Sequence, residues 1–513
     1  MAAGIGAVEG VGATFCPPDR RIYVLVATIL ASAMGFIDGS VVSIAIPAIR
    51  ADLGATLADA QWVSNGYMLF MASLMLIGGA AGDRFGLRRV FSFGIGLFVL
   101  ASLLCALSPN PPFLIVCRAV QGFGAAFMVP GSLALIAKAY PREARGRAIG
   151  IWATAASLTT ILGPVVGGAL LSALGNWGWR LVFAINLPFG VLALALLWLR
   201  VPGDPAADGR RLDWFGGLLV TVALLLIALG LTGEGSDSAV PTTSHLLAYG
   251  GVGLLLVIAF LVWEARATAP MLPLRLFRNR GFSGANALTF SLYFSLSAIS
   301  FYQPMTLIAG WGVTPALVSL SLLPVGICLT LLSPVSGGLA DRYGTARLIA
   351  GGASLVALAF AGLALTAPLR SLWFGVVPLM TVMGIGMGFV VTPLSTAVMT
   401  SVADSDTGTA SGVNNAVARV AGLFAVAVMG GVAALVFGHA LAGAEAAGLS
   451  FGRPPEAGQL TPAVEQLRLA ATNAAFSAIA WTTAALSALS AVIAWVTLEH
   501  KQRGPGAASP AGK

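Results

Sequence analysis

Apolar stretches of about twenty residues recur along the chain from Ile22 almost to the C-terminus. A helix needs about 20 apolar residues to cross a hydrocarbon core roughly 30 Å thick, so each stretch is long enough to span a bilayer. Charged residues make up only 9% of the chain, whereas a soluble domain carries about 25%. The sequence therefore predicts an all-α polytopic membrane protein.

Glycine, proline and charged residues divide these stretches into about fourteen expected helices. We place the helices at 22–49, 61–82, 90–107, 112–137, 148–174, 179–199, 214–231, 245–263, 281–308, 315–340, 346–365, 371–399, 407–436 and 473–496. The predicted domains are an N-terminal tail at 1–21, a six-helix bundle at 22–200, an inserted helix pair with its linkers at 201–280, a second six-helix bundle at 281–497 and a C-terminal tail at 498–513.

The distribution of basic residues predicts the orientation. Most lysines and arginines fall in loops on the side that carries both termini. The opposite side receives only Arg50, Arg180, Arg370, Arg453 and Arg468. Because cytoplasmic loops are enriched in Lys and Arg, we expect both termini in the cytoplasm and the chain in the bacterial inner membrane. The same loops account for the net charge of +8 without nucleic acid as a partner.

Very few charges remain within the predicted spans. Asp38 is the one acid clearly at mid-depth, and Arg118 and Arg419 are the basic residues inside the membrane. Such a charge costs roughly 2.5–3.5 kcal/mol on insertion scales, which makes a functional role the first hypothesis. A buried carboxylate can bind and release protons near neutral pH. We expect Arg118 to pair with Asp38, directly or through Gln121; the alternative is an Asp38 satisfied by hydroxyls such as that of Ser40.

An internal repeat is visible. The segment GGAAGDRFG from Gly78 to Gly86 is echoed by GGLADRYG from Gly337 to Gly344. Repeated helix bundles are the architecture of many secondary transporters, with the substrate site between the halves. The helices expected between 214 and 263 have no counterpart in the repeat and form an inserted pair.

Four stretches resemble the motifs of the major facilitator superfamily, in particular its drug/proton antiporter group with fourteen helices. These are IDGSVVSIAIP at 37–47, GAAGDRFGLRR at 79–89, RAVQGFGAA at 118–126 and LGPVVGG at 162–168. The chain departs from the usual motifs at four positions. Ser43 replaces Asn, Ile46 replaces Leu, Ala81 replaces Leu and Leu87 replaces a basic residue. The last two departures predict a slightly weakened second motif.

The resemblance implies a fold of two six-helix bundles plus two inserted helices, and a role for Asp38 and Arg118 in proton coupling. It implies a cytoplasmic latch that breaks as the halves rock. The latch residues are Gly79, Gly82, Asp83, Arg84, Gly86, Arg88 and Arg89, with the repeated Asp341 and Arg342. It also implies an antiporter motif, associated with export, at Gly163, Pro164, Gly167 and Gly168.

Polar and aromatic side chains within the expected helices are candidates for substrate contact. They are Tyr67, Gln121, Asn286, Tyr293, Tyr302, Gln303, Asn414, Asn415 and Arg419. Arg419 is equally compatible with an anionic substrate group and with pairing to helix-end carbonyls. Because Asp38 is the only membrane acid available, the sequence favours neutral, amphipathic or zwitterionic substrates over dications.

We expect proton-coupled export of small, amphipathic or drug-like compounds by alternating access. The alternatives are an exporter of an endogenous metabolite, peptide or lipid-like product, and a membrane sensor without transport. An enzyme is not expected, because the sequence has no phosphate-binding Gly-Lys-Ser/Thr loop, no metal-ligand spacing and no nucleophile motif. Protons are the expected coupling ion, with no cofactor or metal. The expected partners are a small-molecule substrate and membrane lipid, for a monomer with or without a periplasmic adaptor.

Overall fold

The computed structural model describes residues 14–204, 212–233, 241–441, 449–454 and 460–498. In these ranges the chain forms helices joined by short turns and contains no strand. This confirms the predicted all-α class. Most of the two tails predicted at 1–21 and 498–513 lies outside the described residues.

The first group of helices extends to Arg200. Its members are η1 (Pro18–Arg20), α1 (Arg21–Leu53), α2 (Leu57–Phe85), α3 (Leu87–Ala106), α4 (Pro111–Ala139), α5 (Arg142–Leu174), η2 (Gly175–Gly178), α6 (Trp179–Ala184) and α7 (Asn186–Arg200). α2 begins at a capping box in which Thr56 and Asp59 each accept a hydrogen bond from the other's backbone amide. α4 begins where the Asn110 side chain accepts from the amide of Phe113. These polar residues satisfy free amides and set where the helices begin.

A second group follows at the expected place of the inserted pair. Its members are α8 (Trp214–Leu231), α9 (Thr243–His245), η3 (Leu246–Gly250), α10 (Gly251–Arg266) and η4 (Leu274–Arg278). α8 and α10 pack closely because a glycine faces the partner backbone: a Cβ at Gly253 of α10 would meet the backbone of Ala223 and Ile227 in α8. α8 also packs against α2, where a Cβ at Gly217 would meet Ile77. The pair is therefore held to the first group through α2.

The third group completes the chain. Its members are α11 (Arg280–Met305), η5 (Thr306–Gly310), α12 (Pro315–Tyr343), α13 (Thr345–Thr366), η6 (Ala367–Leu369), η7 (Leu372–Val376), α14 (Val377–Thr400), η8 (Asp404–Asp406), α15 (Thr407–Ala440) and α16 (Pro462–Thr497). α2 and α12 end in the same way, at Gly86 with φ 94° and at Gly344 with φ 92°. Such positive φ angles favour glycine. The repeat detected in the sequence is therefore also a repeat of backbone geometry.

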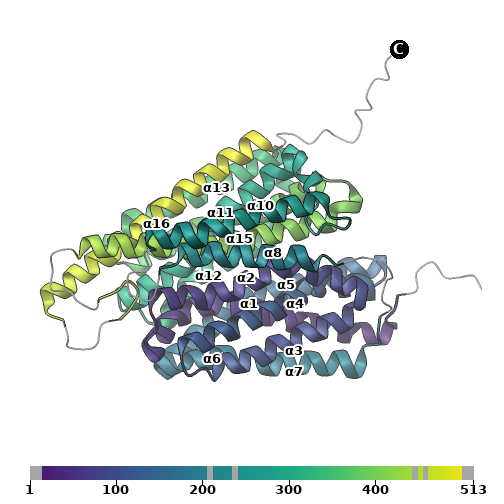
Figure 1. The fold of residues 1–513 in the computed structure, drawn as a ribbon, viewed down its shortest axis with the longest axis horizontal. Coiled ribbons are helices and arrows are strands. Elements are labelled where there is room, and N and C mark those ends of the chain that lie inside the picture. The colour runs from purple at the N-terminus through teal and green to yellow at the C-terminus, as the bar shows by residue number, and fades with distance from the viewer. Residues whose placement is uncertain (1–13, 205–211, 234–240, 442–448, 455–459, 499–513) are drawn as a thin grey trace, which may run out of the picture.

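The first and third groups form two layers (Figure 1), with the purple and blue N-terminal helices on one side and most of the green and yellow C-terminal helices on the other. Within the first group α4 packs against α2 and α3, and α1 against α5 and α7. Within the third, α13 packs against α14 and α16, and α12 against α14. The two groups meet mainly through α2 with α15 and α5 with α12. The domain boundaries proposed from the sequence stay predictions.

Twelve segments of the described chain are long and apolar enough to cross a membrane. One of them, Arg142–Arg200, has 59 residues, whereas about 20 residues suffice for one crossing. It contains the break at η2 between α5 and α6. α11 is not among the twelve, because polar residues such as Asn286 and Ser295 lower the mean hydropathy of its sequence. The expected number of fourteen spans and the side of the termini stay predictions.

The last helix begins earlier than expected. α16 starts at Pro462, where the sequence predicted a start at 473, because Thr461 caps its first turn. Glu465 in that turn forms an ion pair with Arg468 in the next turn, with an N–O distance of 2.7 Å. Arg468 is buried and also donates to two backbone carbonyls at the end of η5. Charged residues that suggest a loop in the sequence therefore extend the helix instead.

Close packing of α2 on α4 leads to a prediction. A Cβ at Gly78 would overlap the carbonyl of Ala126 on α4, and overpacking of this kind costs about 1–3 kcal/mol. Gly78→Ala should therefore lower the melting temperature of the detergent-solubilised protein. Gly96→Ala on α3 is the control, because its Cβ would meet nothing within 4 Å. Equal melting temperatures for the two variants would contradict this packing.

Candidate functional site

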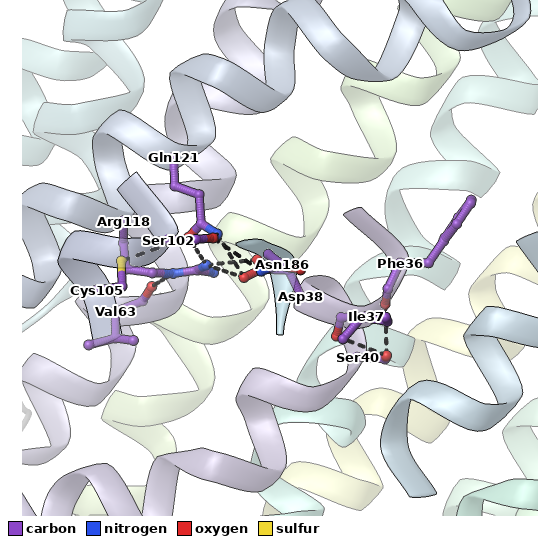
Figure 2. A network of polar contacts seen from close by, with 10 residues as sticks. All are labelled: Phe36, Ile37, Asp38, Ser40, Val63, Ser102, Cys105, Arg118, Gln121 and Asn186. Carbon is purple, nitrogen blue, oxygen red and sulfur yellow. Dashed lines mark hydrogen bonds and ion pairs between the residues drawn. The ribbon is translucent and has the colours of Figure 1, made fainter. Parts of the chain in front are cut away.

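A buried ion pair joins α1 to α4. The side chains of Asp38 and Arg118 are 1% and 2% exposed. Nη1 of Arg118 donates to both carboxylate oxygens of Asp38, at 2.7 and 2.8 Å (Figure 2). Buried charges are costly unless they are paired and hydrogen-bonded. The structure therefore brings together the two charged residues that the sequence placed inside the N-terminal bundle.

Further polar side chains form hydrogen bonds around the ion pair. Gln121 Oε1 accepts a 2.6 Å hydrogen bond from Arg118, and its Nε2 donates to Asp38 at 3.1 Å and to Ser102 at 2.7 Å (Figure 2). Ser102 on α3 also accepts a hydrogen bond from the Asn186 amide on α7, at 3.1 Å. We call Asp38, Arg118, Gln121, Ser102 and Asn186 the buried polar network. The network ties four helices of the first group to one titratable carboxylate.

Two helices add contacts to the arginine. Arg118 Nε donates to the carbonyl of Val63 on α2, at 2.9 Å. Its guanidinium lies over the ring of Tyr67, 4.4 Å from the centroid, and 5.6 Å from that of Phe183 on α6. A cation over an aromatic face is stabilised further when it is desolvated. Tyr67 and Gln121, expected as substrate contacts, thus both hold Arg118.

The hydroxyl of Ser40 does not satisfy Asp38. It donates instead to the backbone carbonyls of Phe36 and Ile37 within α1, at 2.7 and 3.2 Å (Figure 2). The partners that the sequence analysis missed are Ser102 and Asn186. Nothing in the sequence distinguishes these two residues, because small polar residues are common in helices. Only the packing of α3 against α4 and of α7 against α3 shows that Ser102 reaches Gln121 and that Asn186 reaches Ser102.

The antiporter motif on α5 lies directly against α1. A Cβ at Gly163 would approach Ile37, and one at Gly167 would overlap Val41, on either side of Asp38 in α1. Pro164 is buried between them in α5. On another face of the same helix, a Cβ at Gly168 would overlap Ser319 of α12. The motif therefore lets α5 contact the helix that carries Asp38 and a helix of the third group.

The signature loop, residues 79–89, joins α2 to α3. Gly82 lies against Leu87, and the Arg88 side chain donates to the carbonyl of Trp198 and stacks on its ring. The exposed charged side chains of this loop and its repeat include Asp83, Arg84, Arg89, Asp341 and Arg342. Gly79 packs loosely near Pro130. The latch function of these residues stays a prediction.

Asp204, which the sequence analysis missed, anchors the signature loop. Its side chain is 1% exposed; it accepts from the amides of Leu87 and Arg88, and Lys138 Nζ lies 2.9 Å away. Burial raises the pKa of Asp204, but the hydrogen bonds from Lys138 and the two amides outweigh it and hold the pKa below its ordinary value. Negative charge at a helix start is favourable. The acid after α7 therefore fixes the start of α3.

The first and third groups are joined at the end of the bundle that carries the α1–α2 turn. Gln61 Nε2 donates to the carbonyl of Val426 on α15, at 2.6 Å, and to the hydroxyl of Tyr302. Arg50 is buried and donates to the carbonyl of Phe451, at 2.6 Å. Tyr302, expected as a substrate contact, thus belongs to this junction. Gln303 beside it is buried, and its amide has no hydrogen-bond partner among the described residues.

The remaining substrate candidates gather around one cavity. A cavity of about 220 Å³ is lined by Tyr293 of α11 and by Asn414, Asn415 and Arg419 of α15, with Met68 of α2 on its other wall. Asn286 lies behind it and accepts a 3.3 Å hydrogen bond from Asn414.

The described residues contain no group of His, Cys, Asp and Glu side chains that could hold a metal ion.

The buried ion pair should behave as a coupled unit. Asp38→Asn or Arg118→Met leaves one buried charge uncompensated and should lower the free energy of unfolding by about 3–5 kcal/mol. The double variant removes both charges and should recover most of that loss in a thermal melt. Arg275→Gln is the control, because Arg275 is 69% exposed in its ion pair with Asp406 and an ion pair at the surface should contribute about 1 kcal/mol or less. A double variant that melts at or below the temperature of the less stable single variant would contradict the energetic coupling of Asp38 and Arg118.

The lowered pKa of Asp204 predicts a pH dependence. A carboxylate whose pKa is lowered on folding stabilises the protein above its ordinary pKa of about 4, and this contribution is lost as the pH falls through the lower folded value. Asp204→Asn should therefore lower the melting temperature near neutral pH, with a difference that shrinks as the pH falls below about 4. A difference that stays constant with pH would argue against a charged anchor.

Comparisons with known proteins identify the family of the chain. The family model of the Major Facilitator Superfamily matches residues 28–426. A multidrug resistance protein B homolog of Mycobacterium tuberculosis is 32% identical over 429 residues, covering 82% of this chain and 78% of that protein. A probable actinorhodin transporter of Streptomyces coelicolor is 33% identical over 424 residues, covering 81% of this chain and 73% of that one. A methylenomycin A resistance protein of Streptomyces coelicolor is 33% identical over 408 residues, covering 78% and 84%.

Solved structures show the same fold. A bacterial homolog of the human lysosomal transporter Spinster, in an inward-facing and occupied conformation, aligns with a TM-score of 0.67 and 18% identity over 94% of this chain and 97% of that one. A D-xylose–proton symporter aligns with a TM-score of 0.62 and 15% identity, covering 94% and 97%. The chain therefore belongs to the Major Facilitator Superfamily and is a multi-pass transporter of the bacterial inner membrane, not an enzyme.

Proposed function

We propose that this transporter exports small amphipathic compounds in exchange for protons, with Asp38 as the proton-binding group. The relatives named for multidrug and methylenomycin A resistance support export of drug-like compounds. The observation that carries the proposal is the buried polar network, because it holds a titratable carboxylate 2.7 Å from a buried arginine. Protons are the only coupling ion that the proposal needs.

Protonation of Asp38 changes the balance of charge around Arg118. The neutral carboxyl no longer compensates the guanidinium, and leaving a buried charge without its partner costs about 3–5 kcal/mol. Two conformations of a protein typically differ by a few kcal/mol, so this cost is large enough to change which one is populated. Gln121 and the carbonyl of Val63 accept hydrogen bonds from Arg118 that do not involve the carboxylate.

α5 offers a route from the carboxylate to the junction between the halves. Through Gly167 it packs on Val41 of α1, less than one turn beyond Asp38. Towards its end, Ser172 accepts a hydrogen bond from the amide of Ala316 at the start of α12, at 3.0 Å. A shift of α1 that follows protonation would therefore displace a helix that contacts the other half.

The junction supports an inward-facing assignment. The contacts of Gln61 and Arg50 join the halves at the end with the α1–α2 turn, which is the outer end in the topology proposed from the basic residues. In the cycle we propose, a proton from outside reaches Asp38 when this end opens, and the signature loop latches the inner end. A single chain holds both the network and the cavity, so a monomer is the proposed working unit.

Transport in proteoliposomes tests the function. A susceptibility panel in a pump-deficient bacterial host, with the chain expressed or absent, selects a compound that it protects against. An inward proton gradient should drive uphill movement of that compound by the parent, whereas Asp38→Asn and Arg118→Ala should lose the uphill component, because neither retains the proton-linked pair.

The matched control for this assay is Asp19→Asn. Asp19 is an exposed acid at the start of the described chain, and its neutral variant should transport like the parent. Uphill transport by Asp38→Asn at the parent's rate would overturn the assignment of the proton-binding group. A compound gradient that forms equally without a proton gradient would overturn antiport itself.

A further inference from the structure

Arg419 stands apart from the other charges of the membrane-embedded region. It is twelve residues into α15 from Thr407, which is about 18 Å along the helix axis. A cation at such depth is costly and needs a partner or a water-filled space. The side chain is half-buried and lines the cavity between α2, α11, α14 and α15.

The buried arginines elsewhere in the chain are paired within the protein. Arg118 binds Asp38, Arg468 binds Glu465 and Arg50 binds a backbone carbonyl. The guanidinium of Arg419 makes no hydrogen bond or ion pair with any residue that the structure describes. Pairing with helix-end carbonyls, one of its two expected roles, is therefore not observed. The other expected role of Arg419, contact with an anionic group of a substrate in the cavity, is the one that its unpaired N–H donors favour.

The rest of the cavity wall is neutral. Apart from Arg419 it contains no charged side chain, and its polar groups include Tyr293, Ser411, Asn414 and Asn415. Two amide groups are already engaged: Asn414 Nδ2 donates to Thr289 at 2.7 Å and Asn415 Nδ2 donates within α15. The hydroxyl of Tyr293 has no hydrogen-bond partner among the described residues. A cation and a free hydroxyl donor therefore line a wall without any acid.

We propose that this cavity binds the anionic group of the exported compound, with Arg419 supplying the charge and the Tyr293 hydroxyl an additional hydrogen bond. Arginine binds carboxylates and related planar oxyanions through charge-assisted hydrogen bonds. The cavity of about 220 Å³ is smaller than the roughly 300–1,000 Å³ of sites that enclose drug-sized ligands. It fits the charged end of an amphipathic acid, with Met68, Val398 and Met399 offering apolar contacts.

The proposal narrows the substrate class of the exporter and rests on the proposed function for the movement of that substrate. It replaces the preference for neutral or zwitterionic compounds, which rested on the lack of membrane acids. The charge of Arg118 is already matched by Asp38, so Arg419 is the cation available to a ligand. A dication would meet an uncompensated positive charge and should bind poorly.

Binding without any proton gradient tests the proposal separately from transport. The full chain is placed in nanodiscs of phosphatidylcholine, which contain no anionic lipid, and its affinity for 2-naphthoate and for the neutral isostere 2-naphthamide is measured by equilibrium dialysis. The parent should prefer the carboxylate. Arg419→Gln should weaken naphthoate binding about tenfold to a hundredfold, the range expected for a lost charged hydrogen bond, and leave naphthamide binding unchanged.

Two further variants control the result. Arg419→Lys keeps the charge and should retain most of the preference for naphthoate, which a merely structural role of the arginine would not explain. Arg453→Gln removes an exposed arginine in the segment 449–454 at the other end of the bundle and should bind like the parent. A parent without preference for the carboxylate, or an Arg419→Gln variant that binds both probes as the parent does, would overturn the proposal.

The outcome is separable from that of the transport assay. Asp38→Asn should still bind naphthoate with the Arg419-dependent preference, because its change lies outside the cavity wall. Loss of the anion preference with intact proton-driven export would overturn only the substrate class. Intact anion binding without proton-driven export would overturn only the coupling.

Discussion

The ion pair between Asp38 and Arg118 is the interaction on which the arrangement of the N-terminal helices depends. Two opposite charges cannot remain in an apolar bundle unless each is compensated and hydrogen-bonded. Gln121 and Ser102 supply hydrogen bonds from α4 and α3, and Tyr67 supplies an aromatic face from α2. These helices are thereby fixed around one carboxyl group.

The same pair separates the roles of the two halves. In the first, both charges at mid-depth are matched within the protein. In the second, Arg419 has no partner among the described residues and lines a cavity with neutral polar walls. In the two proposals, proton binding belongs to the first half and most of the substrate contact to the second, and α2 contacts both. Tyr67 lies against Arg118 and the next residue, Met68, lines the cavity.

Isolated charges in apolar helices were the most informative feature of the sequence, because nothing but pairing or function keeps them there. Asp38, Arg118 and Gln121 could be named in this way. Tyr67 was named as a substrate candidate, but its contact with Arg118 could not be predicted, since the direction of a side chain depends on helix rotation. Ser102 and Asn186 were missed, because their roles arise only from tertiary packing.

The acidic and basic residues outside the membrane were harder to interpret. Asp204 follows α7 in the sequence but anchors the start of α3, a contact across more than a hundred residues that no local pattern predicts. Glu465 and Arg468 suggested a loop and instead form an ion pair across the first two turns of α16. In both cases a long-range or capping partner decides the structure, and the partner is visible only in the fold.

Proton release on substrate binding tests the central role of Asp38 most directly. The purified parent, in weakly buffered solution without a membrane potential, should release protons when it binds a compound that it exports, and Asp38→Asn should bind that compound without release. Proton release of equal size from the parent and from Asp38→Asn would contradict the assignment of Asp38 as the group that couples the proton to the substrate.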